Sequence, residues 1–328
     1  MRPSTAEYSV EIPSEVFFGS LAFLWWAFIG AIGVTLIILL VQSTRPRYLD
    51  KQLNALALRT NLELPDSLRP ALAHHVALRM RGALIASMVV FPAFLVWLAP
   101  WSPTPREIGM TGGILGFALV VTAQTFGSVA GGLIARRSAP TPHRSARLSP
   151  PDLSALLAPI ERRFARITAV SGTIAPLLLS ALLLAPWARL PEEIAQGVPA
   201  LIAFGLASGA LYLALPAIGR ALAIRRAIPG DDYALAWSDV LASRTLRDLW
   251  LIVVWVGGMT TVVSVMNLGF ALPADSSPLG LVWANIVMIP FPVTLFFMVV
   301  VIAVKQPERH VQRTLWPELA VDAGRPAQ

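Results

Sequence analysis

The 328-residue sequence contains no cysteine, only two lysines and few charged residues of any kind. The absence of cysteine excludes a secreted scaffold held together by disulfides, and it also excludes a cysteine nucleophile. Asp, Glu, Lys and Arg make up 14% of the chain, where about 25% is usual in soluble proteins. Apolar residues make up 55% of the chain, and the few charged residues cannot form a water-exposed surface around so many. The composition therefore excludes both a disordered chain and a cytosolic enzyme.

Long apolar runs are the main feature that the sequence does contain. A helix needs about 20 apolar residues to cross roughly 30 Å of hydrocarbon, because its backbone groups must be satisfied within the helix itself. Seven runs free of Asp, Glu, Lys, Arg and His have this length: residues 21–41, 82–101, 109–135, 167–187, 198–219, 249–272 and 280–304. The sequence therefore predicts an all-α membrane protein, a seven-transmembrane helix bundle over residues 21–304.

Lysine and arginine fall almost entirely on one side of this bundle. Four segments carry 23 of the 26 basic residues: 42–81, 136–166, 220–248 and the tail 305–328. Positively charged loops are retained in the cytoplasm, so the N-terminal segment 1–20 is predicted to be extracytoplasmic and the C-terminal tail cytoplasmic. Topology and anionic lipid headgroups account for the positive charge, and no nucleic-acid partner is expected.

The chain also contains a faint internal repeat. A shift of 86 residues aligns residues 65–108 with 151–194 without a gap, and ten positions are identical. Seven of these ten lie together near the predicted outer turn, between Leu98 and Ile108. The pattern favours one span followed by three repeated two-helix hairpins, and chance resemblance between Ala- and Leu-rich hairpins is the alternative.

Each proposed hairpin opens with an aspartate that is expected to cap a helix, namely Asp66, Asp152 and Asp232 or its neighbour Asp231. Apolar residues then recur at helical spacing in the second copy: Leu153, Leu157, Ile160, Phe164 and Ile167. This spacing predicts one continuous amphipathic helix at the inner membrane surface, running into the span. Such a helix anchors the chain to lipid, and the alternative is a docking surface for a cytosolic or membrane protein partner.

The residues that carry enzyme chemistry do not form a recognisable site in the sequence. His74 and His75 lack the glutamate and the second ligand of an HExxH zinc helix, and they are expected to be surface residues. A magnesium and diphosphate site would need a second acidic cluster beside Asp231, Asp232 and Asp239, so these three are expected to serve capping and solvation. We therefore expect neither catalytic residues nor a metal or other cofactor.

Within the predicted spans the polar side chains are neutral. The candidates for a narrow polar path are Gln124 and Ser128 on the third span and Thr260, Ser264 and Asn267 on the sixth. The alternative is ordinary hydrogen bonding between helices. Glycines four residues apart, including Gly127/Gly131 and Gly205/Gly209, predict close helix packing, and they suggest that the third span is central.

These patterns predict a multi-pass protein without catalytic machinery. The Ala-, Arg- and Pro-rich composition suggests a bacterial genome, so the expected location is the cell (cytoplasmic) membrane, with the lipid bilayer as the first partner. The leading hypothesis is a permease-like subunit or a membrane assembly component. An autonomous small-solute transporter or channel is the alternative, and a membrane enzyme acting on lipid-linked substrates at the inner leaflet is the third.

Overall fold

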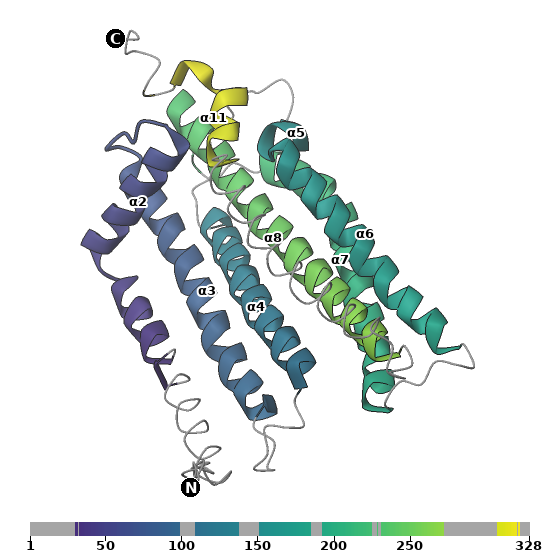
Figure 1. The fold of residues 1–328 in the computed structure, drawn as a ribbon. Helices are drawn as coiled ribbons and strands as arrows, with labels where there is room; N and C mark the ends of the chain where they lie inside the picture. The colour runs from purple at the N-terminus through teal and green to yellow at the C-terminus, as the bar shows by residue number, and fades with distance from the viewer. Residues whose placement is uncertain are drawn as a thin grey trace, which may run out of the picture.

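The structure of the chain is a computed structural model that describes residues 30–31, 33–98, 109–137, 151–184, 192–224, 228, 231–271, 307–319 and 321. These ranges are helical and contain no strand (Figure 1). The five long helices are α3 (Arg69–Leu98), α4 (Gly109–Arg137), α6 (Pro159–Leu183), α7 (Glu192–Ile224) and α8 (Asp232–Ala271). The shorter elements are α2 (Pro46–Thr60), α5 (Leu153–Leu156), η1 (Pro307–Arg309), α11 (His310–Leu315) and η2 (Pro317–Leu319).

Four of the helices are long and apolar enough to cross a membrane. They are Arg69–Pro92, Pro159–Leu182, Gly197–Ile224 and Asp232–Leu268. The prediction of an all-α membrane fold is confirmed at this level. Of the remaining predicted spans, 109–135 lies in α4, 21–41 is described only in part, with a shorter apolar helix at Gly33–Gln42, and 280–304 lies outside the described residues.

Two helices begin well before the apolar runs from which they were predicted. Helix α3 starts at Arg69 although the apolar run starts at residue 82, and α8 starts at Asp232 although its run starts at residue 249. With 40 residues, α8 is about 60 Å long, roughly twice the thickness of the hydrocarbon core. Polar residues at these ends do not stop the helices, because neighbouring elements supply their partners.

Helix α8 lies at the centre of the bundle. It packs against α4, α6 and α7, whereas α3 packs mainly against α4 (Figure 1). It is also the most buried of the four candidate spans. The third predicted span, in α4, has the close neighbours that its glycines predicted, because it packs against both α3 and α8. Among the described helices, however, α8 contacts more neighbours than α4 does.

Glycines bring the helix backbones into direct contact at two places. In the first, Gly82 on α3 lies against Gly127 on α4, and an added Cβ on either would overlap the carbonyl oxygen of the other. In the second, three helices meet at Gly172 on α6, Gly205 on α7 and Gly257 on α8. The prediction that Gly127 and Gly205 mark close packing is confirmed, because a side chain at these positions would force the helices apart.

A second layer of helices covers the N-terminal half of α8. This inner layer consists of α2, α5, α11 and the two short 3₁₀ turns, and it encloses the first turns of α8 (Figure 1). Its apolar core includes Leu53, Leu72, Trp237 and Leu241, all fully buried. The indole of Trp237 donates a hydrogen bond of 3.0 Å to the carbonyl oxygen of Glu63, which ties α8 to the turn before α3. We call the end of the bundle that carries this layer the inner end.

The predicted amphipathic helix after Asp152 is broken into α5 and α6. Leu157 and Ala158 are extended, with ψ of 132° and 149°, and α6 begins at Pro159. The prediction of one continuous helix is wrong because a proline disfavours helical geometry in the residue before it and is itself suited to the first helical position. Ile167, expected on the same apolar face, is 61% exposed and points away from the core.

The aspartates expected to cap helices differ in what they do. Asp231 caps α8, because its Oδ1 accepts the N–H of Ala234 at 3.0 Å. Asp152 occupies the N-cap position of α5 without a side-chain capping bond. Asp66 lies three residues before α3 and forms an exposed ion pair with Arg69 at 2.8 Å. Only the alternative Asp231 acts as the sequence predicted.

The contact of α6, α7 and α8 predicts a steep cost for a side chain at Gly205. We expect Gly205→Leu to lower the free energy of unfolding by about 1–3 kcal/mol or more, because overpacking forces the backbones apart. Ala203→Leu, on the exposed face of the same helix, should change it by less than about 0.5 kcal/mol. Unfolding in mixed micelles, followed by circular dichroism, measures both, and equal stabilities would contradict the packing described here.

Candidate functional site

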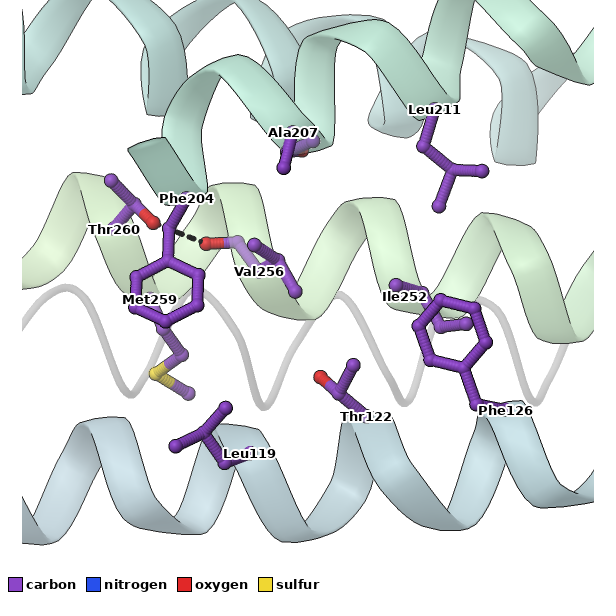
Figure 2. Close-up of a pocket in the computed structure, with 11 residues that line it drawn as sticks. Leu119, Thr122, Phe126, Phe204, Ala207, Leu211, Ile252, Val256, Met259 and Thr260 are labelled. Atoms are coloured by element: carbon purple, nitrogen blue, oxygen red, sulfur yellow. Dashed lines mark hydrogen bonds between the residues drawn. The ribbon is translucent and has the colours of Figure 1, made fainter. Parts of the chain in front are cut away.

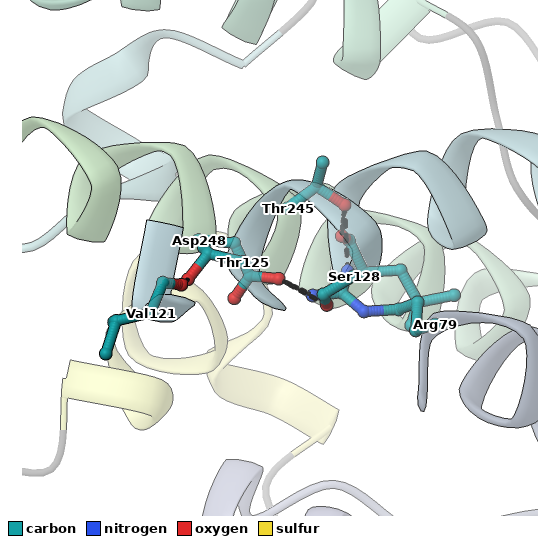
Figure 3. Close-up of polar contacts among 7 residues, drawn as sticks. Arg79, Val121, Thr125, Ser128, Thr245 and Asp248 are labelled. Carbon is teal, nitrogen blue, oxygen red and sulfur yellow. Dashed lines mark hydrogen bonds and ion pairs between the residues drawn. The ribbon is translucent and has the colours of Figure 1, made fainter. Parts of the chain in front are cut away.

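A carboxylate at the inner end joins three helices. Asp248 on α8 accepts Arg79 Nη2 of α3 at 2.5 Å and Ser128 Oγ of α4 at 2.6 Å, both on Oδ2 (Figure 3). The same guanidinium donates through Nη1 to Thr245 Oγ1 at 2.9 Å. We call these four residues the Asp248 cluster. It lies where the helices pass from the inner layer into the apolar part of the bundle.

The local sequence explains how α8 presents this cluster. Thr245 and Asp248 are three residues apart, so they lie on one face of the helix, toward α3 and α4. The planar guanidinium of Arg79 can reach both acceptors at once, which a lysine could not do with the same geometry. The Arg79 side chain is 5% exposed and that of Asp248 is 18% exposed, so the two charges depend on each other. A buried pair of this kind contributes little net stability when intact and costs much when one partner is removed.

A second buried ion pair joins α8 to α6 beside the first. Arg247 Nε donates to Glu161 Oε1 at 2.5 Å, and the Glu161 side chain is fully buried. Glu161 Oε2 accepts the N–H of Ala158 at 2.9 Å, and the Trp250 indole donates to the Glu161 carbonyl oxygen. Because Arg247 and Asp248 are adjacent on a helix, they point about 100° apart, and each holds a different neighbour of α8.

The inner ends of α4 and α7 are also connected. Arg136 on α4 donates through Nη1 to the carbonyl oxygen of Leu222 on α7 at 2.9 Å. Burial lowers the pKa of the Arg136 guanidinium to about 10, while the charge of Asp239 acts in the opposite direction. At neutral pH this arginine remains protonated. Each described long helix is thus tied to a neighbour by a contact that involves a charged side chain.

The histidines and acids considered for metal chemistry lie in different environments. His74 is exposed as expected, but His75 is buried, so its prediction as a surface residue is wrong. The His75 side chain is 3% exposed and lies in the same buried stretch of α3 as Val76 and Arg79. Asp231 and Asp232 are exposed, whereas Asp239 is buried and accepts the Trp316 indole at 3.0 Å. In the described ranges no three side chains of His, Asp or Glu gather into a group that could hold a metal.

An apolar cavity of about 280 Å³ lies just outward of the Asp248 cluster (Figure 2). Its floor is α8 and its two walls are α4 and α7. It is lined by Leu119, Thr122, Phe126, Phe204, Ala207, Ser208, Leu211, Ile252, Val256, Met259 and Thr260. We call it the α4–α7–α8 cavity. Ile252 is one helical turn beyond Asp248, so the ion pair and the cavity adjoin along α8.

Three hydroxyl groups line this otherwise apolar cavity. Thr260 Oγ1 donates to the Val256 carbonyl oxygen at 2.7 Å, and Ser208 Oγ donates to the Val253 carbonyl oxygen at 3.1 Å. The hydroxyl of Thr122 is buried and has no hydrogen-bond partner. The cavity therefore offers one unsatisfied polar atom among hydrocarbon side chains.

The five residues of the predicted polar path do not share one surface. Gln124 is exposed, Ser128 belongs to the Asp248 cluster, and Thr260 lines the cavity. Ser264 and Asn267 are buried further along α8, and their Oγ and Oδ1 atoms lack hydrogen-bond partners. Of the five, the structure gives an interhelical side-chain bond only to Ser128. That the other four residues contribute to a path for a solute stays a prediction.

Sequence reasoning missed the ionised residues that hold the site together. Arg79, Glu161, Arg247 and Asp248 lie next to the apolar runs and were counted only as charges that set the topology. One signal was present, because Asp248 directly precedes the apolar run 249–272. An acid at such a boundary needs a buried cation, although the sequence does not say which one.

Removing one member of the buried pair is predicted to be far more damaging than removing both. We expect Asp248→Ala to lower the free energy of unfolding by about 3–5 kcal/mol, because Arg79 is left buried without its counterion. The double variant Arg79→Met, Asp248→Leu should recover at least half of that loss. Asp66→Ala, which breaks the exposed pair with Arg69, should cost less than about 1 kcal/mol. Denaturation in detergent tests all three, and a double variant no more stable than Asp248→Ala would contradict this account.

Comparison with known proteins gives no relative for this arrangement. No family model matches the chain, and no curated protein and no solved structure matches it either. The functional proposal therefore rests on the geometry of the Asp248 cluster and of the α4–α7–α8 cavity.

Proposed function

We propose that this chain is a seven-span protein of the bacterial cytoplasmic membrane, with its N-terminus outside and its C-terminus in the cytoplasm. The direction of the described helices supports this topology. The N-terminal ends of α3, α6 and α8 and the C-terminal ends of α4 and α7 lie together at the inner end (Figure 1). Three of the four arginine-rich segments adjoin these ends, and the fourth includes α11 in the inner layer. The positive-inside rule then assigns the inner end to the cytoplasm.

We further propose that the protein works as a permease-like subunit or a membrane assembly component, without catalytic chemistry of its own. The observation that carries this proposal is the continuity of α8 from the inner layer into the membrane bundle. Its first half is enclosed by the inner layer, and its second half packs against α4, α6 and α7. Arg247 and Asp248 clamp it to three helices at the boundary. A displacement of the inner layer by a bound partner would then be transmitted through α8 to the spans.

The autonomous transporter or channel is the second candidate, and the cavity beside Thr260 is the observation in its favour. A polar solute path would need Gln124 on the same surface, but that side chain is exposed and does not line the cavity. The apolar lining also disfavours water and ions. These features favour the subunit over the transporter.

The topology predicts which single cysteines a membrane-impermeant maleimide can label. The chain has no native cysteine, so Asn54→Cys and Thr104→Cys each place the only thiol in the protein. In intact cells we expect labelling of Thr104→Cys but not of Asn54→Cys, and labelling of both after the membrane is opened. Labelling of Asn54→Cys in intact cells would place the arginine-rich side outside and overturn the topology.

The subunit hypothesis predicts that an exposed apolar residue of the inner layer contacts a partner. Leu58 on α2 is 75% exposed. Introducing a charge there should reduce recovery of a native complex, because a buried apolar contact at an interface typically contributes at least about 2 kcal/mol when it is a hot spot. We expect Leu58→Glu to lower co-purification of the partner at least about tenfold, and the matched control Leu58→Met to leave it unchanged.

A transport assay on the purified protein distinguishes the autonomous transporter or channel from the permease-like subunit. The purified single chain, reconstituted into vesicles, should not carry potassium or chloride, measured by release of a trapped salt gradient. Salt release by the single chain, with unchanged recovery of the complex in Leu58→Glu, would contradict the subunit proposal and favour an autonomous channel.

A further inference from the structure

Three of the described helices, α4, α7 and α8, line the α4–α7–α8 cavity. Helices α4 and α7 both pack along α8, but within their described parts they do not pack along each other. They are joined at the inner end by the bond from Arg136 to the Leu222 carbonyl oxygen. Within the described residues the cavity is therefore floored by α8, with α4 and α7 as two separate walls (Figure 2).

The lining selects the chemistry of an occupant. Phe126 and Phe204 on the two walls and Met259 on the floor present hydrocarbon, aromatic rings and a thioether. Cavities with such linings stay dry, because water needs two or more polar partners. The flexible, polarizable methionine adapts to chains of different shape. An apolar chain fits this site, whereas a hydrated ion does not.

The size of the cavity limits the length of the chain that it encloses. At roughly 30 Å³ for each water-sized group, a volume of about 280 Å³ holds about nine or ten methylene groups. One linear chain of this length fills the space, and two such chains do not fit in it side by side. The rest of a longer molecule would lie outside this volume.

Thr122 adds a polar requirement to this apolar site. Its hydroxyl lines the cavity and is buried without a partner, although the other two hydroxyls of the lining are satisfied by backbone carbonyl oxygens. A buried hydroxyl without a hydrogen bond is destabilising, because it has lost its bonds to water. An occupant with one hydroxyl or carbonyl oxygen removes that cost, which a pure hydrocarbon cannot do.

We propose that the α4–α7–α8 cavity binds a single-chain amphiphile of the membrane, which hydrogen-bonds to Thr122. The site encloses about ten carbons of the chain and one oxygen. Met259, Phe126 and Phe204 supply the apolar contacts. This inference goes beyond the proposed function and depends on it only through the placement of the bundle in the bilayer.

The test uses the full-length protein in phosphatidylcholine vesicles and a diazirine-bearing analogue of 1-dodecanol as the probe. After irradiation, mass spectrometry maps the labelled peptides. We expect labelling of the segments that contain Phe126 and Met259, and we expect excess unlabelled 1-dodecanol to abolish it. Dodecane, which has the same chain without the oxygen, should compete about fivefold less well, as expected for the loss of about 1 kcal/mol from one hydrogen bond.

Two variants and a matched control separate binding in the cavity from general contact with lipid. Ala207→Trp fills the space between the walls and should reduce the saturable labelling at least tenfold. Thr122→Val keeps the volume and should remove the preference for the alcohol over the alkane. Leu178→Trp, on an exposed face of α6, should change neither result.

The proposal is overturned if labelling of the cavity peptides does not saturate, or if Ala207→Trp leaves saturable labelling unchanged. It is also overturned if the alcohol and the alkane compete equally in the unaltered protein. These outcomes are independent of the maleimide experiment, so a protein that spans the membrane as proposed can still fail this test. Labelling of α6 by the probe in the same sample serves as a control, because it shows that the bundle is inserted in the bilayer.

Discussion

A charge that approaches hydrocarbon must be paired, and this constraint accounts for the arrangement of the helices. Asp248 lies at the start of the apolar half of α8, where an isolated carboxylate would be costly. It is satisfied by Arg79 from α3 and Ser128 from α4, so the pairing also sets the position of three helices. Its neighbour Arg247 does the same for α6 through the fully buried Glu161. Charge neutralisation at this level thus holds α3, α4 and α6 in place against α8.

The long central helix gives the molecule two connected parts. The inner layer encloses the first half of α8 around Trp237 and Leu241, and the close glycine contact at Gly257 fixes the second half against α6 and α7. Helix α4 is held on the other side, through Ser128, and within the described residues it does not pack along α7. The apolar cavity lies between α4 and α7, because two helices that pack on one central helix at different faces leave a space between them.

The composition and the apolar runs were sufficient to predict the class of the fold, because the hydrocarbon imposes length and polarity on each segment separately. Glycine spacing also predicted the close contacts at Gly127 and Gly205. The lengths of α3 and α8 were underestimated, since hydropathy stops at the first charge while a helix continues through charges that have partners. The break before Pro159 had a visible local signal, and that signal was outweighed by the apolar periodicity around it.

The sequence by itself determined that this protein is helical, that several of its helices can cross a membrane, and that its arginines gather at one end of the predicted spans. These properties depend on residues close together in the chain. Only the tertiary structure decided that α8 is central, that His75 is buried, and that Asp248 binds Arg79, 169 residues away. It also decided that Thr122 faces a cavity. Such features depend on which helices become neighbours, and neighbours are selected by the summed fit of many side chains that no single segment contains.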